Sequence, residues 1–383
     1  MSRGCSLHEV AELGWDALAG LVPEWDALAA AAAEPNPFYE SWALVPALET
    51  DGPPMRCAAV RIRGELAALF PLQPDTRYKG LPARALRSWR NRHMLLCTPL
   101  VRKGREQEAF AALIAWAARS ASILELDYFP GDGPLRAALG EALGASERPW
   151  LVTYAYERAL LRRAASAEAY VAGMERGVRS ELRRRERRLK EAGRAEYVRL
   201  GSDLERWIEE FLVLEASGWK GQARGALACR ESDVRYARAV LRGAQARGEL
   251  FASGVDLDGK PIARRLCLTS GEGGILFKSA YDEAHARLAP GMLAHLENIR
   301  AFHDQPHRLQ WIDSATGPDN AAANSVWKDR RRVERVAIGV DAWGAFLLTL
   351  LPLLRKAKAK MRPAPAARAA RTETSSPSTG ARP

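Results

Sequence analysis

The order of the expected secondary-structure elements repeats along the chain, and this repeat constrains the fold more than any other feature. In the first half, a β-hairpin at residues 55–71 precedes a strand region at 85–101, a helix at 106–119, a strand at 123–128, a helix at 135–143 and a strand at 150–161. In the second half, a hairpin at 250–257 and 262–269 precedes a strand at 274–281, a helix at 291–302, a strand at 309–313, a helix at 320–330 and a strand at 333–340. Apolar residues at two-residue and three- to four-residue spacing predict these elements. The repeat indicates a duplicated unit of mixed helix and strand.

The duplication leads to a division of the chain of 383 residues. We expect the α/β (α+β) class, with each half a mixed twisted sheet flanked by helices. The expected parts are an N-terminal half at 1–161, a basic bridging helix at 162–200, a C-terminal half at 201–341, a C-terminal helix at 342–362 and a tail at 363–383. The tail is rich in Pro, Ala, Ser, Thr and Arg and lacks apolar anchors, so we expect it to be disordered.

The net charge of +11 is concentrated in two segments. Residues 176–194 hold nine basic and three acidic residues, and residues 355–383 hold eight basic residues and one acid. In the first segment the charges circle the expected helix and few aromatic residues lie nearby, which does not make a stacking platform for nucleic acid. Three interpretations stay open for it: a solvated bridging helix, contacts with CoA or another polyanionic substrate, and contacts with tRNA.

Several other functional classes are not expected. The five cysteines are scattered without a CxxC pair, and Pro306 separates His303 from His307, so we expect neither a disulfide framework nor a metal site. The first thirty residues carry five acids, unlike a signal peptide, and we expect a cytoplasmic protein. Residues 342–360 are apolar and then basic. We expect this segment either to pack on the second half or to contact the surface of the inner membrane.

The stretch at residues 278–296 is the most informative for a binding site. A strand ends at Tyr281, and Pro290 and Gly291 open a helix shortly after it. Proline suits the first helical turn, and glycine lets a ligand approach the backbone closely. The free N–H groups and the positive end of the helix dipole suit a pyrophosphate, to which Arg287 adds positive charge.

The second half resembles a known family over about residues 160–340. Four segments carry the resemblance: residues 214–221 with 225–227, residues 258–263, residues 277–282 through Pro290 and Gly291, and Asp313 with Trp327, Arg330 and Arg331 downstream. The basic stretch that starts at Arg179 is also similar. The family is that of the GNAT acetyltransferases of the CelD-like, cellulose-biosynthesis-associated type, which are similar to the Fem aminoacyl transferases. The first half fits more loosely, so the chain resembles a tandem GNAT protein.

This resemblance implies an acyltransferase that uses acetyl-CoA or another acyl-CoA as co-substrate and an amine or hydroxyl acceptor, in polysaccharide or cell-envelope metabolism. It implies Asp313 as first choice for the general base, Asp282 as second choice, and Tyr281 as the acid that protonates the leaving thiolate. The donor pyrophosphate would lie against Arg287, Pro290, Gly291, Met292 and Leu293. The acceptor groove would include Trp219, Lys220 and Lys278, and the first half would be structural or acceptor-binding.

Two departures from the family pattern keep alternatives open. The pyrophosphate pattern Arg/Gln-x-x-Gly-x-Gly/Ala is not met in register after Arg287. The expected helix at 320–330 has Asn324 and Trp327 instead of the tyrosine that often serves as acid. The alternatives are a Fem-type transferase that takes aminoacyl-tRNA, and a catalytically degenerate GNAT scaffold that acts as a binding protein.

Overall fold

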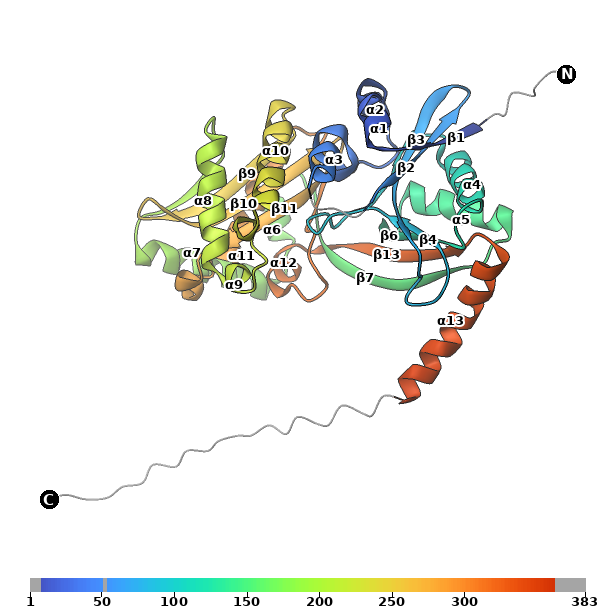
Figure 1. Cartoon of the computed structure of the whole chain (residues 1–383). Coiled ribbons are helices and arrows are strands. Elements are labelled where there is room, and N and C mark those ends of the chain that lie inside the picture. Colours follow the sequence, from blue (N-terminus) through green and yellow to red (C-terminus); the bar gives the residue numbers. More distant parts are fainter. Residues whose placement is uncertain (1–7, 51–53, 362–383) are drawn as a thin grey trace.

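The computed structural model describes residues 8–50 and 54–361. These residues form one mixed β-sheet that runs through the whole molecule, with helices on both faces (Figure 1). The expected mixture of helices and strands with a large mixed sheet is confirmed. The tail at 363–383 lies outside the described residues.

The first half begins with a strand, three short α-helices and one 3-10 helix before its hairpin. Its elements are β1 (His8–Leu13), α1 (Trp15–Ala19), α2 (Val22–Ala30), η1 (Pro37–Tyr39), α3 (Ser41–Leu48), β2 (Arg56–Ile62), β3 (Glu65–Asp75), β4 (Ala85–Ser88), β5 (Leu100–Val101), α4 (Glu106–Ala117), β6 (Ile123–Pro130), α5 (Pro134–Ser146) and β7 (Trp150–Arg162). The strand region expected at 85–101 is instead two short strands, β4 and β5, joined by a loop. This loop, residues 89–99, matters for the site described below.

The second half repeats this order. Its elements are α6 (Ala167–Ala172), α7 (Arg176–Ala192), β8 (Ala195–Arg199), α8 (Leu204–Ser217), α9 (Trp219–Gln222), η2 (Leu227–Cys229), α10 (Glu231–Ala246), β9 (Leu250–Leu257), β10 (Lys260–Ser270), β11 (Gly273–Tyr281), η3 (Glu283–Leu288), α11 (Pro290–His303), β12 (Trp311–Asp313), α12 (Ala321–Val326), β13 (Asp329–Gly339) and α13 (Ala342–Met361). The bridging segment holds two helices and the edge strand β8 rather than one helix.

The two halves exchange their last strands. Along the sheet the order is β1-β2-β3-β4-β6-β13-β7-β12-β11-β10-β9-β8, and β5 pairs with β3. Strand β13, from the end of the second half, lies beside β6, and β7, from the end of the first half, lies beside β12. The antiparallel β7–β13 pair joins the two sets at the centre of the sheet. The division of the chain at residue 161 stays a prediction. In space the two halves are not separate, because each contributes a strand to the other's part of the sheet.

One hydrophobic core also spans both halves. It packs α2 and α3 of the first half together with α8 and α10 of the second on one face of the sheet. Helix α8 places apolar residues at three- and four-residue spacing, including Leu204, Ile208 and Phe211, and its N-terminus is capped by the Asp203 side chain. Helices α3 and α10 approach closely at Gly243, where an added Cβ would lie 3.3 Å from the Trp42 carbonyl oxygen. This packing fixes the second half's helices against the loop at 89–99.

Candidate active site

A cavity of about 380 Å³ opens in the second half where β11 and β12 separate. The two strands run parallel, and their pairing ends at Ile275 opposite Asp313. Beyond this point, residues 276–281 of β11 line one wall and residues 314–317 line the other. Glu215 at the end of α8, Trp219 and Lys220 of α9, and Leu95 from the first half complete the lining. The cavity therefore has walls from both halves.

A β-bulge shapes the cavity wall on β11. Leu266 of β10 lies opposite Lys278, while the next residue, Cys267, lies opposite Leu276, so Phe277 has no partner on β10. A bulge bends a strand and changes the direction of the side chains after it. The Phe277 ring packs edge-on against Phe38 and Tyr236 in the shared core. The bulge thus turns the following residue, Lys278, toward the cavity and the loop of the first half.

Lys278 is joined to two residues that are far from it in sequence. Its Nζ lies 2.9 Å from Nδ1 of His93, which belongs to the 89–99 loop of the first half. The other ring nitrogen, Nε2, lies 2.9 Å from Oδ1 of Asp233 on α10. A carboxylate only accepts hydrogen bonds, so a neutral His93 carries its proton on Nε2 and accepts a hydrogen bond from Lys278 at Nδ1. We call Asp233, His93 and Lys278 the relay.

Burial sets the protonation states in the relay. It lowers the pKa of Lys278 to about 8, an effect that the nearby Glu215 carboxylate opposes. Burial, with the positive charge of Lys278 as second cause, lowers the pKa of His93 to about 4 despite the hydrogen bond to Asp233. Near neutral pH, His93 is therefore neutral and an appreciable fraction of Lys278 is an uncharged amine. An amine with its pKa near the working pH is a competent proton acceptor.

A second charged pair fixes the α8–α9 corner beside the relay. Oε1 of Glu215 accepts a hydrogen bond from Nζ of Lys220 at 3.0 Å, and Oε2 accepts one from the backbone N–H of Leu227 at 2.8 Å. Lys220 also donates to the carbonyl oxygen of Ser279 on β11 at 2.8 Å. Trp219, more than half exposed, follows at the rim of the cavity. The three residues expected to bind the acceptor, Trp219, Lys220 and Lys278, therefore line one cavity, and their roles remain predictions.

The structure does not support Asp313 as the general base. Its side chain is completely buried and does not line the cavity. The carboxylate is ion-paired with Arg158 of β7, with Oδ1 2.6 Å from Nε and Oδ2 2.7 Å from Nη2, and Arg331 lies 3.4 Å away. Oδ1 also accepts the backbone N–H of Ala315 at 2.9 Å. A carboxylate held by these donors stabilises the junction of the two halves and the start of the cavity wall.

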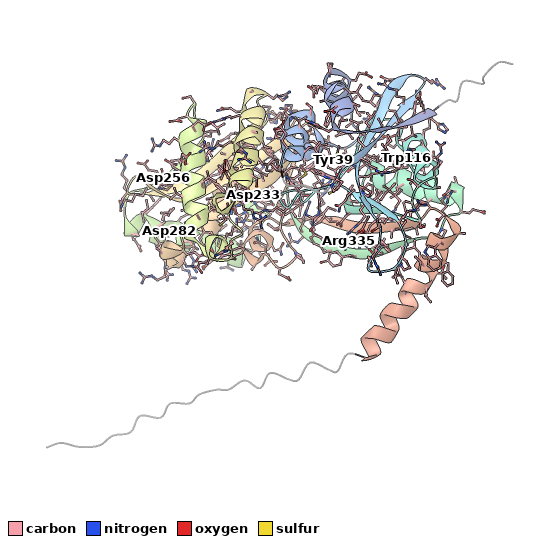
Figure 2. All side chains as sticks on the ribbon, in the orientation of Figure 1. Tyr39, Trp116, Asp233, Asp256, Asp282 and Arg335 are labelled. Atoms are coloured by element: carbon pink, nitrogen blue, oxygen red, sulfur yellow. The ribbon has the colours of Figure 1, made fainter. Side chains whose placement is uncertain are left out.

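The second expected base, Asp282, is also engaged elsewhere. Its Oδ1 caps η3 by accepting the Ala284 N–H at 2.8 Å, and its Oδ2 lies 2.8 Å from Nδ1 of His285. Figure 2 shows Asp282 well apart from Asp233, the acid of the relay. The expected acid, Tyr281, does line the cavity and is partly exposed. Neither acid expected as a base lines the cavity, whereas the tyrosine expected as the acid does.

The residues expected to hold the donor pyrophosphate lie at the start of α11. Pro290 is the buried first residue of the helix, and Gly291 packs under the Tyr281 ring, where an added Cβ would lie 3.2 Å from Cδ1. The N–H groups of Met292 and Leu293 donate to the Ala289 carbonyl oxygen at 3.0 and 3.2 Å. The helix start therefore borders the cavity through Tyr281, while those two N–H groups are already hydrogen-bonded within the first turn.

Arg287 lies apart from this helix start. It lines a separate surface hollow with Arg188 and His285, and its carbonyl oxygen accepts a hydrogen bond from Nη1 of Arg185 at 2.7 Å. The expected cluster of five pyrophosphate ligands is thus divided between two places. Across the described residues, there is no group of His, Cys, Asp or Glu side chains arranged to hold a metal ion. Nor does that part of the chain contain a helix long and apolar enough to cross a membrane.

Sequence reasoning missed His93 and Asp233. They lie 185 and 45 residues from Lys278, and neither belongs to a motif with recognisable spacing. Their one local signal is composition: Asn91, Arg92 and His93 form a polar group inside a stretch otherwise expected to be a buried strand. A polar group of this kind in an expected strand indicates a loop that contacts another part of the molecule.

Comparisons with known proteins concern the fold and the family of part of the chain. Residues 176–329 match the family model described as an acetyltransferase (GNAT) domain. The crystal structure of FemX superposes with a TM-score of 0.57 at 13% identity, covering 89% of this chain and 99% of that chain. No curated protein sequence matches this chain.

Two further solved structures share the fold at 10–14% identity. A conserved protein of unknown function from Bacteroides thetaiotaomicron VPI-5482 has a TM-score of 0.54 at 14% identity, covering 83% of this chain and 97% of that one. The C-terminal domain of a putative lysylphosphatidylglycerol synthetase from Agrobacterium fabrum has a TM-score of 0.54 at 10% identity, covering 88% and 97%. At these identities the similarity shows the fold alone. The comparisons therefore show a GNAT acetyltransferase domain match over residues 176–329 and a fold shared with these structures over most of the chain.

Proposed function

We propose that this protein transfers an acyl group from acetyl-CoA or another acyl-CoA to an amine or hydroxyl acceptor, as a CelD-like enzyme of cytoplasmic polysaccharide or cell-envelope metabolism. One observation supports the proposal most directly. A lysine with its pKa lowered to about 8 faces a cavity at the separation of two parallel strands, in the domain that matches the GNAT family. Perturbed titratable groups that converge on a cavity are typical of active sites.

The cavity fits the acyl end of such a donor. The edge of β11 that faces β12 loses its strand partner after Ile275, so backbone groups of the following residues are available to a linear amide-containing chain. Tyr281 and the start of α11 lie at one end of this edge, toward which the pyrophosphate would extend. The donor would supply a thioester carbonyl, and backbone N–H groups at the bulge would stabilise the negative charge that develops on its oxygen.

The relay supplies the proton acceptor. Neutral Lys278 takes the proton that the attacking amine or hydroxyl loses. His93 keeps Nδ1 directed at the Lys278 Nζ and so orients the amine and stabilises the ammonium that forms. Asp233 holds the His93 ring through Nε2 and is itself ion-paired with Arg92. Tyr281, at the end of the same strand, donates a proton to the leaving thiolate.

A Fem-type transferase that takes aminoacyl-tRNA is the second candidate. The fold agrees with FemX over nearly its whole length. Helix α7 also exposes Arg183, Arg187, Arg188 and Lys190, which suit a polyanionic donor. Under this candidate the relay keeps its role, because an aminoacyl ester also reacts with a nucleophile that must lose a proton.

Calorimetry with acetyl-CoA and with charged tRNA distinguishes the donors. We expect acetyl-CoA to bind at micromolar concentration to the full chain, and binding to survive a Lys278→Gln substitution. Transfer of labelled acetyl to a panel of amines and sugars should occur with the native chain and be at least about 10²-fold slower with the variant. Binding of charged tRNA alone would favour the Fem-type candidate. Binding of neither donor would overturn both and leave a degenerate scaffold.

A further inference from the structure

The first part of helix α13 packs on the body of the molecule. Leu347, Leu348 and Leu351 are buried against first-half residues such as Tyr78 and Ala85, and against Ala337 of β13, rather than on the second half alone as expected. The rest of the helix extends away from the molecule, as the red helix in Figure 1 shows. Packing against the core therefore explains the apolar residues of the first part of α13, but not why the helix continues beyond it.

The packed part of α13 also exposes an aromatic pair. Trp343 and Phe346 are 43% and 55% exposed, and their rings stack with centroids 5.5 Å apart and an angle of 19° between the planes. Leu350 is partly exposed and follows at the spacing that continues the same side of a helix. No other pair of exposed large apolar residues in the described residues belongs to one helix. The side of α13 that turns away from the body is thus apolar.

The sequence of this helix and of the loop at its base is rich in basic residues. Helix α13 has no acidic residue, and its sequence carries Arg355, Lys356, Lys358 and Lys360 after the aromatic pair. The loop between β3 and β4 lies at the base of the helix, because Nε1 of Trp343 donates to the Pro82 carbonyl oxygen at 3.1 Å. This loop exposes Arg77 and Arg84. An apolar side and a basic end therefore occur together on one projecting element.

We propose that α13 docks the protein on an anionic lipid surface. Trp343 and Phe346 enter the headgroup region, where aromatic side chains are favoured, and the net positive charge of the α13 sequence attracts anionic headgroups. Charge complementarity selects this occupant, since the sequence of α13 carries four basic residues and no acidic one. The proposal is independent of the acyl donor and of the relay, because no residue of α13 lines the cavity.

The test is cosedimentation of the full chain with vesicles of phosphatidylcholine alone or with about one third phosphatidylglycerol. We expect binding to the anionic vesicles only, weakening as salt rises. Changing Arg355, Lys356, Lys358 and Lys360 together to Gln should weaken binding by about 10²-fold, since each basic residue near the surface contributes roughly a fivefold factor at most. Phe346→Ser should weaken binding by about tenfold.

Matched controls separate docking from general electrostatic attraction. The quadruple change of Arg183, Arg187, Arg188 and Lys190 to Gln removes as many exposed cations from α7, and Val213→Ser removes an exposed apolar side chain from α8. Both should bind vesicles within twofold of the native chain. Equal loss in the α7 and α13 variants would overturn the proposal, as would equal binding to both vesicle types. A dimer in solution abolished by Phe346→Ser, without vesicle binding, would assign the surface to a second copy, and binding of duplex RNA in preference to vesicles would assign it to nucleic acid.

Discussion

The two halves of the sheet contain the same strand separation, but only one of them is open. In the first half, β4 and β6 run parallel and their pairing ends at Arg87 opposite Glu125, as that of β11 and β12 ends at Ile275 opposite Asp313. In the second half a cavity of about 380 Å³ follows. In the first half, Trp89 follows and is completely buried. The same backbone arrangement therefore gives a site in one half and a filled core in the other.

The segment that fills the first separation also builds the site in the second. The carbonyl oxygen of Trp89 accepts a hydrogen bond from the Tyr39 hydroxyl at 2.5 Å, and the Arg90 guanidinium lies over the Tyr128 ring. A few residues later the same loop supplies His93 to the relay and Leu95 to the cavity wall. A half without an open cleft of its own is thus still required, because its loop completes the cleft of the other half.

The largest expected effect concerns Lys278. Its replacement by Gln should slow single-turnover transfer by about 10²–10⁴-fold, the usual range for a lost proton acceptor, with donor affinity unchanged. The native rate should rise with pH up to about 8 and then level off, because burial lowers the pKa of Lys278 to about 8 and only the uncharged amine accepts a proton. The variant should lose this dependence.

The control for this change lies at the equivalent position of the first half. Arg90 is the third residue after the last parallel pair of β4, as Lys278 is the third after the last pair of β11. Arg90→Gln should leave the rate within about threefold and its pH profile unchanged. A pH profile that stays the same in Lys278→Gln would show that another group takes the proton.

The next effect tests whether the side chain of Trp89 fills the space beyond the last β4–β6 pair as part of the hydrophobic core. Trp89→Ala removes a completely buried side chain and should reduce the free energy of unfolding by about 3–5 kcal/mol. Phe277→Ala, two positions after the last parallel pair in the second half, should cost less, because that residue borders the cavity. Urea denaturation of both variants gives the comparison. Donor binding to the first half of Trp89→Ala, detected by photolabelling with an acyl-CoA analogue, would mean that the two clefts differ by this side chain alone.

A third, smaller effect concerns a buried acid that occurs at the equivalent position in each half. Asp313 and Glu125 occupy equivalent positions opposite the last parallel residue, and both are completely buried beside arginines. Asp313→Asn should reduce the free energy of unfolding by about 3 kcal/mol, since it leaves the Arg158 charge without its partner. The transfer rate of the folded fraction should change less than threefold. A rate loss of 10²-fold without loss of stability would return Asp313 to the role of base.

The sequence predicts the elements better than it predicts the site. The hairpins, the β11–α11 connection and the order of elements are encoded locally, by apolar spacing and by Pro290 and Gly291, and these predictions agree with the structure. The strand exchange is not encoded locally, because the apolar spacing of β7 and β13 predicts a strand but does not say which neighbouring strand it pairs with. The relay could not be predicted either, since it depends on a loop of one half that contacts a helix and a strand of the other. The sequence around Asp313 also does not indicate that Arg158, far away in the chain, pairs with its carboxylate.

The smallest expected effect concerns the start of α11, which the sequence singles out as the donor site. A side chain at position 291 would press on the Tyr281 ring, because a Cβ there would lie only 3.2 Å from Cδ1. Gly291→Val should therefore displace Tyr281 into the cavity and weaken acetyl-CoA binding about tenfold, with a change in melting temperature of no more than a few degrees. Titration calorimetry measures the affinity, and Gly144→Val in α5, where an added Cβ meets nothing within 4 Å, is the matched control in the first half. If Gly291→Val and Gly144→Val bind acetyl-CoA equally well, the donor does not extend along the Tyr281 end of the cavity, and the second half holds only the acyl group and the relay.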